Sequence, residues 1–328
     1  MERVLVTGAT GFLGGVLVRQ LHRSGVNVVA TGRDRARLDR LPLPEAARIA
    51  LDLTQPLAVP EHRLAGVTTV VHCAALSSPW GAGAAFQAAN VLATEALLAL
   101  AHRIGVAHFV FISSPSVYFR FADQHGVCEA MSLPRPVNAY ARTKRIAETR
   151  VAESGLPFTI LRPRGLYGQG DTSLLPRLLR AAKSGALPLL RQGQAVTDLS
   201  HVEDVVAAIR AVLDQRGQSL GKTYNISGGQ ALRLTDIVDA ACKANGFAAR
   251  WRSLPLGPTL AAVRLAELAA ALTPGAAEPR VTAYGLGIFA YSQTLDLTRV
   301  QHDLGWRPQI DFDEGLRRTF SANPGAET

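Results

Sequence analysis

Apolar and polar positions follow two alternating patterns along the first half of the chain. Short, continuous apolar runs are typical of strands buried on both faces, and longer segments with helical periodicity separate them. The predicted strands lie at residues 3–8, 27–33, 47–53, 68–76, 108–118 and 157–163, and helices at 11–25, 86–105 and 139–155. This alternation predicts an α/β fold of the Rossmann type, a doubly wound parallel sheet covered by helices on both faces.

The pattern loosens after Pro163, where glycine, proline and arginine become frequent. A helix over 201–215 and a strand over 222–227 look like returns to the main sheet. We therefore predict a Rossmann domain at residues 1–163, with returning segments at about 195–227. Residues 164–194 and 228–328 form a smaller, discontinuous C-terminal lobe that binds the substrate.

The first strand runs into a turn, TGATGFLGG, with Gly8, Gly11 and Gly14 spaced three apart. At a first β-to-α junction, such glycines allow a tight turn, close approach of a phosphate and close helix–strand packing. The free N–H groups at the helix N-terminus favour an anion. The turn is therefore interpreted as a pyrophosphate site, although glycines at a helix entry can also serve packing alone.

The end of the second strand favours NADP(H), with NAD(H) as the alternative cofactor. A carboxylate there would bind a ribose 2′-hydroxyl, but the position is occupied by Gly32, followed by Arg33. An arginine fork can hold a 2′-phosphate. In the competing interpretation, Arg33 is only a surface residue and Asp34 binds the ribose hydroxyl. Asp52 is a candidate for the adenine amino group or for an N-cap.

Tyr140 and Lys144 lie at i and i+4 of a predicted helix and so share a face. An ammonium beside a phenol is expected to lower the phenol pKa from roughly 10 toward neutrality. Such a tyrosine can exchange a proton with a substrate oxygen. The serine-rich strand end ISSPSVY, with Ser114, lies upstream at the carboxyl edge of the sheet, where ligands of such sheets bind.

These motifs, together with VVHCAAL, LRPRGLYG and HVEDVV, occur in the order found in the extended short-chain dehydrogenase/reductases, which the whole chain resembles. The resemblance implies that Ser114 binds the substrate oxygen, with Ser113 and Ser116 as less favoured neighbours. It implies that Tyr140 is the acid/base and that Lys144 holds the nicotinamide ribose. Asn90 matches the family's asparagine on the central helix, and its role could be functional, at the active site, or purely structural. The predicted cofactor contacts are Gly8, Thr10, Gly11, Phe12, Leu13, Gly14, Arg33, Asp52, Leu53, Cys73, Ala74, Ala75, Ser77, Asn90, Tyr140, Lys144 and Pro163.

The segments SSPWG, SSPSVY, LRPRGLYG and LDLTRVQHDLGWRP resemble the 3β-hydroxysteroid dehydrogenase-like branch of this family. This implies an oxidoreductase that interconverts a secondary alcohol and a ketone on a hydrophobic, steroid-like or β-keto acid-like substrate. Dehydration is disfavoured because Pro115 and Ser116 replace an Asp-Glu pair. The alternatives are a nucleotide-sugar 4-epimerase with tightly bound NAD and a non-catalytic dinucleotide-sensing protein. Arg164, Arg177 and Arg191 could bind a phosphate or a carboxylate.

Two loop aromatics, Trp80 and Tyr167, are candidates for the substrate pocket, although loop aromatics more often anchor packing. His201 is expected to cap or position a helix. Cys73 is expected to be a buried strand residue whose backbone meets the cofactor, rather than a nucleophile.

The composition narrows the class of protein. With 48% hydrophobic residues, 328 residues can bury a large core, and three dispersed cysteines predict reduced thiols and no zinc site. The net charge is +9, but the arginines are scattered, so a basic surface with an anionic cofactor is favoured over nucleic-acid binding. We expect a cytoplasmic protein with neither signal peptide nor integral membrane span. The resemblance further implies a homodimer formed through the helices of Asn90 and Tyr140.

Overall fold

A seven-stranded parallel sheet forms the centre of the computed structural model, which describes residues 2–55, 59, 61–272, 279 and 281–321. The strand order is β12-β7-β5-β4-β1-β2-β3. The bounds are β1 (Arg3–Thr7), β2 (Asn27–Gly32), β3 (Arg48–Ala50), β4 (Thr69–His72), β5 (His108–Ile112), β7 (Phe158–Pro163) and β12 (Lys222–Ile226). The order reverses between β1 and β4, so the doubly wound Rossmann prediction is confirmed.

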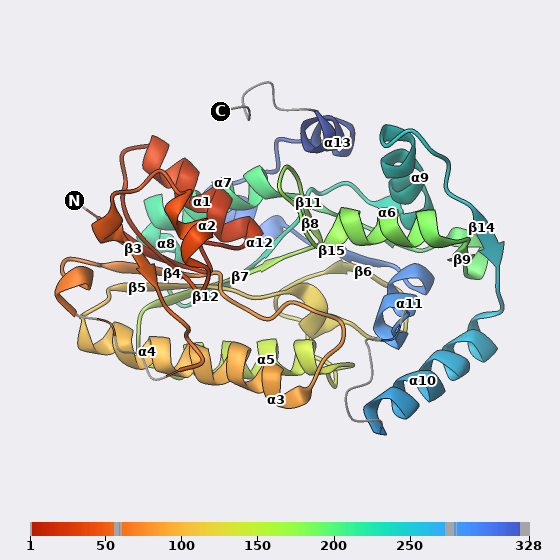
Figure 1. Cartoon of the computed structure of the whole chain (residues 1–328), viewed down its shortest axis with the longest axis horizontal. Helices are drawn as coiled ribbons and strands as arrows, with labels where there is room; N and C mark the ends of the chain where they lie inside the picture. Colours follow the sequence, from red (N-terminus) through yellow and green to blue (C-terminus); the bar gives the residue numbers. More distant parts are fainter. Residues whose placement is uncertain (1, 56–58, 60, 273–278, 280, 322–328) are drawn as a thin grey trace.

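Helices cover both faces of this sheet (Figure 1). One layer contains α1 (Phe12–Arg23), α2 (Arg35–Asp39), α7 (Val202–Asp214), α8 (Arg216–Ser219) and α12 (Thr298–Leu304). The other contains α3 (Gly83–Phe86), a π-helical turn (Gln87–Leu92), α4 (Ala93–Arg103) and α5 (Ala139–Ala152). Short 3₁₀ turns lie at Glu45–Ala47, Glu61–Leu64, Pro115–Tyr118 and Arg191–Gly193. Each layer encloses its own apolar cluster against the sheet.

The second lobe is built from small sheets and peripheral helices at the other end of the molecule (Figure 1). Its largest sheet has the order β13-β10-β15-β6. These strands are β6 (Gln124–Val127), β10 (Val196–Thr197), β13 (Leu232–Arg233) and β15 (Gln293–Leu295), and the two small pairs are β8 (Leu166–Tyr167) with β11 (Ser200–His201) and β9 (Leu187–Leu189) with β14 (Trp251–Ser253). The helices are α6 (Leu174–Ser184), α9 (Leu234–Ala244), α10 (Leu256–Leu272), α11 (Ala283–Ala290) and α13 (Phe312–Phe320).

The chain crosses between the two parts more often than the predicted boundaries suggest. Strand β12 joins β7, and α7 packs on α1, as the sequence pattern indicated. However, β6 comes from the first half of the chain and pairs with β15 of the second lobe. Conversely, Val300 and Trp306 from the C-terminal segment are buried in the first core. The strands that close the second sheet are too short to show a period in the sequence.

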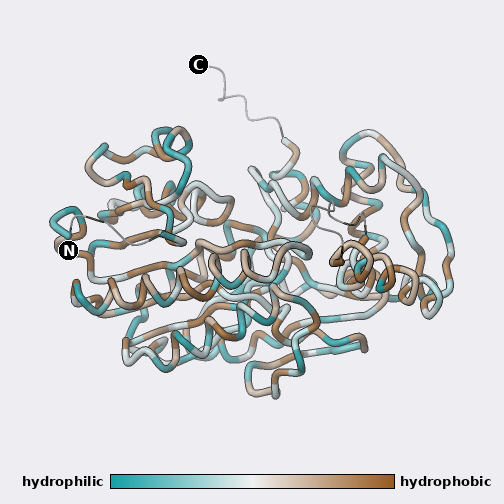
Figure 2. Tube along the Cα trace, turned by 60° about the horizontal axis from the view of Figure 1, so that its bottom comes forward, coloured by the Kyte–Doolittle hydropathy of each residue, from teal (hydrophilic) through white to brown (hydrophobic). Residues whose placement is uncertain are grey.

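The strands of the main sheet are apolar because both faces are covered. All residues of β4 and β5 are buried, and the hydrophobic colour in Figure 2 follows such segments through the interior. Among the described helices, the stretch Gly83–Arg103 is long and apolar enough to span a bilayer by composition, but half of its window is buried inside the protein. Core packing explains its hydropathy, so the stretch is weak evidence for a membrane span.

Candidate active site

The glycine turn after β1 is shaped by close backbone contacts. Gly8 has a φ of 66°, and a Cβ there would lie 2.7 Å from the amide nitrogen of Ala74. A Cβ on Gly14 would lie 2.3 Å from the Gly8 carbonyl oxygen. Helix α1 begins after Gly11 with no described side chain capping it and no acidic residue in its first turn. The exposed N–H groups and the space kept free of side chains fit a pyrophosphate.

The ends of β2 and β3 carry the residues that were predicted to choose the cofactor. A Cβ on Gly32 would lie 2.6 Å from Cγ2 of Thr10, so no acidic side chain fits there without a shift. Asp34 caps α2 by accepting a hydrogen bond from the Arg37 amide at 3.0 Å, and Arg33 is exposed directly after β2. Asp52 accepts hydrogen bonds from the amide and hydroxyl of Thr54, which lower the pKa of Asp52, as Arg33 does to a smaller degree.

Asn90 holds the loop after β4 against α5. Its Oδ1 accepts a hydrogen bond from the Leu76 amide at 2.7 Å, and its Nδ2 donates to the Thr143 hydroxyl at 3.1 Å. Asn90 lies in the π-helical turn, a local irregularity that is frequent at functional sites. The remaining predicted cofactor contacts lie at the same sheet edge: Thr10, Phe12, Leu13, Leu53, Cys73, Ala74, Ala75 and Pro163.

A buried hydrogen-bonded chain beneath this loop joins β1, β4 and the π-helical turn. The Ala74 amide donates to Thr7 Oγ1 at 3.3 Å, and Thr7 Oγ1 lies 2.7 Å from Nδ1 of His72. His72 Nε2 lies 3.0 Å from Oγ1 of Thr94, which donates to the Asn90 carbonyl. Burial lowers the pKa of His72 to about 3, so the imidazole is neutral. Its two nitrogens therefore accept and donate one hydrogen bond each and fix the edge of the sheet.

The predicted catalytic hydroxyls meet at this edge. Ser114 follows β5, and Tyr140 lies in the first turn of α5, whose N-cap is Asn138. The Tyr140 hydroxyl lies close to the hydroxyls of Ser77 and Ser114, and its interaction with both lowers the pKa of Tyr140. Ser77, predicted only as a cofactor contact, therefore also lies at the reactive phenol. Asn138 escaped the sequence analysis, although an asparagine directly before a helical pattern is an N-cap signal.

The expected lowering of the Tyr140 pKa by Lys144 is wrong for this structure. Burial raises the pKa of Tyr140, and the interactions with Ser77 and Ser114 offset this only in part. Lys144 is itself buried; its Nζ donates to the Ile112 carbonyl oxygen at 2.6 Å and lies 4.3 Å from the centre of the Phe111 ring. The ammonium of Lys144 is thus hydrogen-bonded at the end of β5 and not to the Tyr140 phenol. Burial lowers the pKa of Lys144 to about 8, and Glu148 opposes this.

The second lobe supplies an aromatic wall that the sequence analysis missed. Tyr284 in α11 packs edge-on against Phe119, with ring centres 5.0 Å apart. Burial raises the pKa of Tyr284, and both Arg164 and Tyr140 are close enough to influence it. A Cβ on Gly287 would lie 2.9 Å from the ring of Phe119, so α11 approaches this wall closely. No periodicity in residues 281–291 signals such a contact, because tertiary packing creates it.

Four other predicted residues lie in the second lobe or in the segment directly after β4. Tyr167 is 2% exposed and packs between His201 and Phe312 in the core of the second lobe, so its predicted substrate contact is not supported and packing explains it. Trp80 is half-buried in the loop after β4, next to Ser78. His201 caps α7, as expected. Cys73 was expected to be a buried strand residue, but it is half-buried and lies directly after β4. Desolvation raises the pKa of its thiol to about 12, which argues against a nucleophilic thiolate, as expected.

Arg164 is buried and donates to the Thr197 hydroxyl and the Gln293 side chain, and Arg191 forms an ion pair with Asp123 at 2.7 Å.

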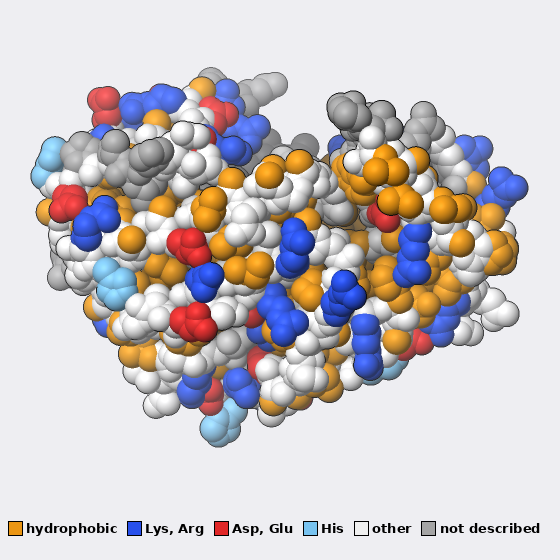
Figure 3. Space-filling model, turned by 90° about the horizontal axis from the view of Figure 1, so that it is seen from below, with side chains coloured by type: hydrophobic (Ala, Val, Ile, Leu, Met, Phe, Trp, Pro, Cys, Tyr) orange, Lys and Arg blue, Asp and Glu red, His pale blue; other side chains and the backbone are white. Residues whose placement is uncertain are grey.

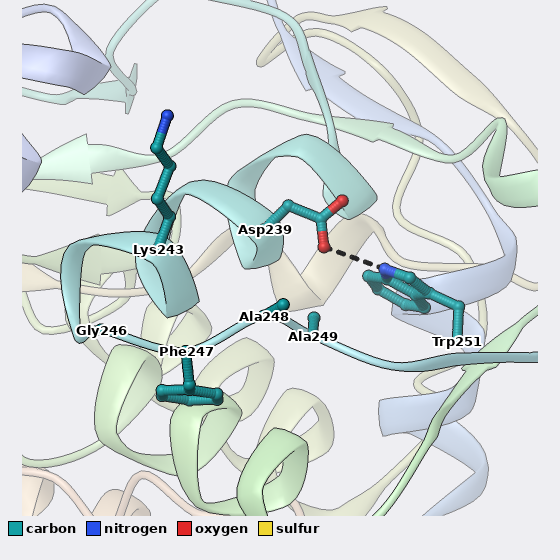
Figure 4. A pocket seen from close by; sticks show the side chains of 7 residues that line it. All are labelled: Asp239, Lys243, Gly246, Phe247, Ala248, Ala249 and Trp251. Carbon is teal, nitrogen blue, oxygen red and sulfur yellow. Dashed lines mark hydrogen bonds between the residues drawn. The ribbon is translucent and has the colours of Figure 1, made fainter.

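A surface hollow of about 610 Å³ beside α9 contains none of the predicted catalytic residues; there Trp251 Nε1 donates to Asp239 at 2.9 Å (Figure 4). Within the described part of the chain, no group of three or more His, Cys, Asp or Glu side chains could hold a metal ion.

The comparison with known proteins agrees with this architecture. The model of the NAD dependent epimerase/dehydratase family matches residues 4–227. The chain is 35% identical to the uncharacterized protein YbjS of Escherichia coli (strain K12), with 97% of this chain and 96% of that one covered. It is 30% identical to a 2-alkyl-3-oxoalkanoate reductase of Stenotrophomonas maltophilia (strain K279a), with 96% and 98% covered. Among solved structures, MoeE5 in complex with UDP-glucose and NAD has a TM-score of 0.73 at 29% identity, with 97% of each chain covered.

The chain therefore belongs to the NAD dependent epimerase/dehydratase family, and the predicted resemblance to extended short-chain dehydrogenase/reductases is confirmed. It is an NAD(P)-dependent enzyme of a class that comprises oxidoreductases, epimerases and dehydratases.

Proposed function

We propose that this enzyme is an NADP(H)-preferring oxidoreductase that interconverts a secondary alcohol and a ketone on a hydrophobic substrate. The observation that carries the proposal is the contact of the Tyr140 hydroxyl with Ser114 and Ser77 at the carboxyl edge of the sheet, facing an aromatic wall. A β-keto acid or a steroid-like ketone suits this wall. The printed name of one relative, 2-alkyl-3-oxoalkanoate reductase, supports the β-keto acid-like class.

In this mechanism the side chains hold the substrate oxygen and move one proton. When bound, the nicotinamide supplies or accepts the hydride. Ser114 donates a hydrogen bond to the carbonyl oxygen and positions it at the Tyr140 hydroxyl. Because burial raises the pKa of Tyr140, the phenol is protonated at neutral pH and can give its proton to the developing alkoxide. We assign the nicotinamide ribose to Lys144, whose Nζ donates to the Ile112 carbonyl oxygen at the end of β5.

A substrate screen tests the reaction class. We expect NADPH consumption with 2-alkyl-3-oxoalkanoates or steroid ketones, and none with UDP-glucose. The 4-epimerase alternative, which the structural similarity to MoeE5 in complex with UDP-glucose and NAD makes relevant, predicts conversion of UDP-glucose to its 4-epimer with no net consumption of NADPH, and no reduction of the ketones. An epimerase would also retain NAD through purification, so the dinucleotide released from denatured protein should be measured. A dinucleotide-sensing protein would bind NADPH but turn over no substrate.

The cofactor preference can be tested at Arg33. We expect Arg33→Asp to weaken NADPH binding roughly tenfold to a hundredfold, because a hydrogen bond to a charged group contributes about 1.5–3 kcal/mol. NADH binding should change little. The matched control is Arg40→Asp, an exposed arginine seven residues further on. Fluorescence titration measures both dissociation constants. Tighter binding of NADH than NADPH by the wild type would contradict the assignment.

We also propose that the enzyme is a cytoplasmic homodimer formed through the helices that carry Asn90 and Tyr140. Leu92 is 52% exposed next to this surface, and Figure 3 shows apolar side chains between the charged ones on the face of α4 and α5. Burial of such side chains would stabilise association. Sedimentation analysis measures the state.

A further inference from the structure

A second hollow, of about 540 Å³, lies between α1, α7, the C-terminal end of α13 and the loop after β8. Its lining includes four arginines, Arg19, Arg23, Arg317 and Arg318, and one acidic side chain, Glu203. The formal charge of the lining is therefore 4 − 1 = +3, with His201 neutral. Neither Tyr140 nor any other predicted catalytic residue lines it.

Two of these arginines have no counter-charge in the described structure. Arg19 and Arg23 lie one turn apart on α1, and neither forms a hydrogen bond or ion pair with a described residue. Partial burial lowers the pKa of Arg19, and the neighbouring charge of Arg23 lowers it further. Their mutual repulsion would be relieved by a bound anion.

The other two arginines are already oriented by acidic partners. Arg317 donates two hydrogen bonds of 2.7 Å to Glu314. Arg318 donates to Glu314 at 2.7 Å and to Glu203 at 2.6 Å. Glu203 is thereby occupied by Arg318 and leaves the charges on α1 uncompensated. The hollow thus combines two preorganised cations with two unpaired ones.

His201 adds a buried donor. It is 2% exposed, and its Nδ1 accepts a hydrogen bond from the Glu203 amide at 3.4 Å, so Nε2 carries the proton. Nε2 has no hydrogen-bond partner within the described ranges. A Cβ on Gly168 would lie only 3.1 Å from Nε2, so the glycine avoids crowding this nitrogen. A buried N–H without a partner is rare and needs a ligand or water.

The N-terminus of α7 also faces this region. The helix begins at Val202, which lines the hollow, and runs for 13 residues. Its first turn presents backbone N–H groups and the positive end of the helix dipole. Glu203 and Asp204 lie in the same turn and oppose this field, although Glu203 is paired with Arg318 and Asp204 accepts from the Gln309 and Ile310 amides. The arginine charges and the unpartnered Nε2–H of His201 are therefore the main features that favour a multiply charged oxyanion.

We propose that this hollow is a second ligand site, which binds a small phosphate-bearing anion independently of the dinucleotide. Arginine forks match the paired oxygens of phosphate groups, and the neutral His201 donor adds direction. The site is close to the glycine turn, since a Cβ on Gly170 would lie 3.9 Å from the Phe12 ring. The dinucleotide site must therefore be filled before the second site is tested.

Isothermal titration with tripolyphosphate, on full-length protein saturated with the tighter-binding of NADP⁺ and NAD⁺, tests this site. Ionic strength is held constant with chloride, and sulfate and inorganic phosphate are titrated in parallel. We expect one site per chain, with affinity falling from tripolyphosphate to phosphate. Arg19→Gln/Arg23→Gln should weaken binding at least tenfold, and His201→Asn, which keeps a capping oxygen, several-fold. The matched control is Arg250→Gln/Arg252→Gln, two exposed arginines at β14.

The proposal is overturned if the saturated protein binds no tripolyphosphate at 1 mM ligand, roughly the weakest affinity worth calling a site. It is also overturned if Arg19→Gln/Arg23→Gln binds as the wild type does, or if the β14 control loses as much. Tighter retention of a single-stranded oligonucleotide, lost in the same variants, would replace the small anion by a nucleic acid. Arg19 and Arg23 are exposed, so their variants remain informative even if His201→Asn does not fold.

Discussion

Tyr140→Phe should reduce turnover by roughly two to four orders of magnitude, the usual range for loss of a general acid/base. The substitution removes one hydroxyl, the atom that meets Ser114 and Ser77. Without it, the developing alkoxide has no proton donor, although Ser114 still binds the oxygen. The NADPH dissociation constant should remain within a few-fold of the wild type. Steady-state kinetics and fluorescence titration give the two quantities separately.

Tyr167→Phe is the matched control for this variant. It also removes one phenolic hydroxyl from a buried tyrosine, but in the core of the second lobe. We expect its turnover to stay within about threefold of the wild type, since a residue remote from the reacting atoms contributes no general-acid catalysis. Similar losses in the two variants would point to a structural effect. Near-normal turnover of Tyr140→Phe would remove Tyr140 from the mechanism.

The sequence predicted the part of the site that local pattern determines. The glycine turn, the strand ends and the i, i+4 pair of Tyr140 and Lys144 all lie within continuous segments, so a period of two or 3.6 places them. The sheet order then brings the carboxyl ends of β1, β4 and β5 to one edge. Ser114 and Tyr140, 26 residues apart in the chain, meet there for that reason.

The parts that could not be predicted depend on distant contacts. The aromatic wall of Tyr284 and Phe119 joins segments that no shared period links. The pKa shifts of the site could not be predicted either. Burial disfavours the charged forms of both Tyr140 and Lys144, and burial depends on the tertiary structure. The sequence shows that an ammonium and a phenol share a helix face. It does not show that the Ile112 carbonyl takes the ammonium.

A buried ion pair lies one turn beyond Lys144 on α5. Glu148 accepts hydrogen bonds from Nε and Nη2 of Arg162 at 2.8 and 2.5 Å, and both side chains are 7% exposed. Arg162 also donates to the hydroxyl of Tyr118, which donates to Asn225 at 3.0 Å. The pair therefore connects α5 to β7, to the turn after Ser114 and to β12. Glu148 is a positioning residue in this arrangement, because it acts through Lys144 and Arg162.

Glu148→Gln should lower the free energy of unfolding by about 3–5 kcal/mol, because removing one partner leaves the Arg162 charge buried and uncompensated. The matched control is Glu153→Gln at the C-cap of the same helix, where the ion pair of Glu153 with Arg150 spans 3.7 Å between side chains that are 64% and 50% exposed. We expect the control to change the free energy of unfolding by less than about 1 kcal/mol. Denaturant titration of both variants measures the difference. If both variants changed the free energy of unfolding by the same small amount, the buried pair of Glu148 and Arg162 would not have the structural importance assigned to it.

A pH profile separates the electrostatic effect of Glu148 from its effect on stability. Burial lowers the pKa of Lys144 to about 8, and the Glu148 carboxylate raises it against that burial. Without the carboxylate, the pKa should fall below about 8, and the ammonium should be lost at a lower pH. The alkaline limb of kcat should therefore move to lower pH in Glu148→Gln and stay in place in Glu153→Gln. A lysine in the unfolded chain titrates near 10.4. Between the pKa of folded Lys144 and 10.4, the unfolded chain therefore binds more protons than the folded one, and stability rises with pH in that range. In Glu148→Gln this range should begin at a lower pH. A variant that loses stability but keeps the alkaline limb of the wild type would confine Glu148 to packing.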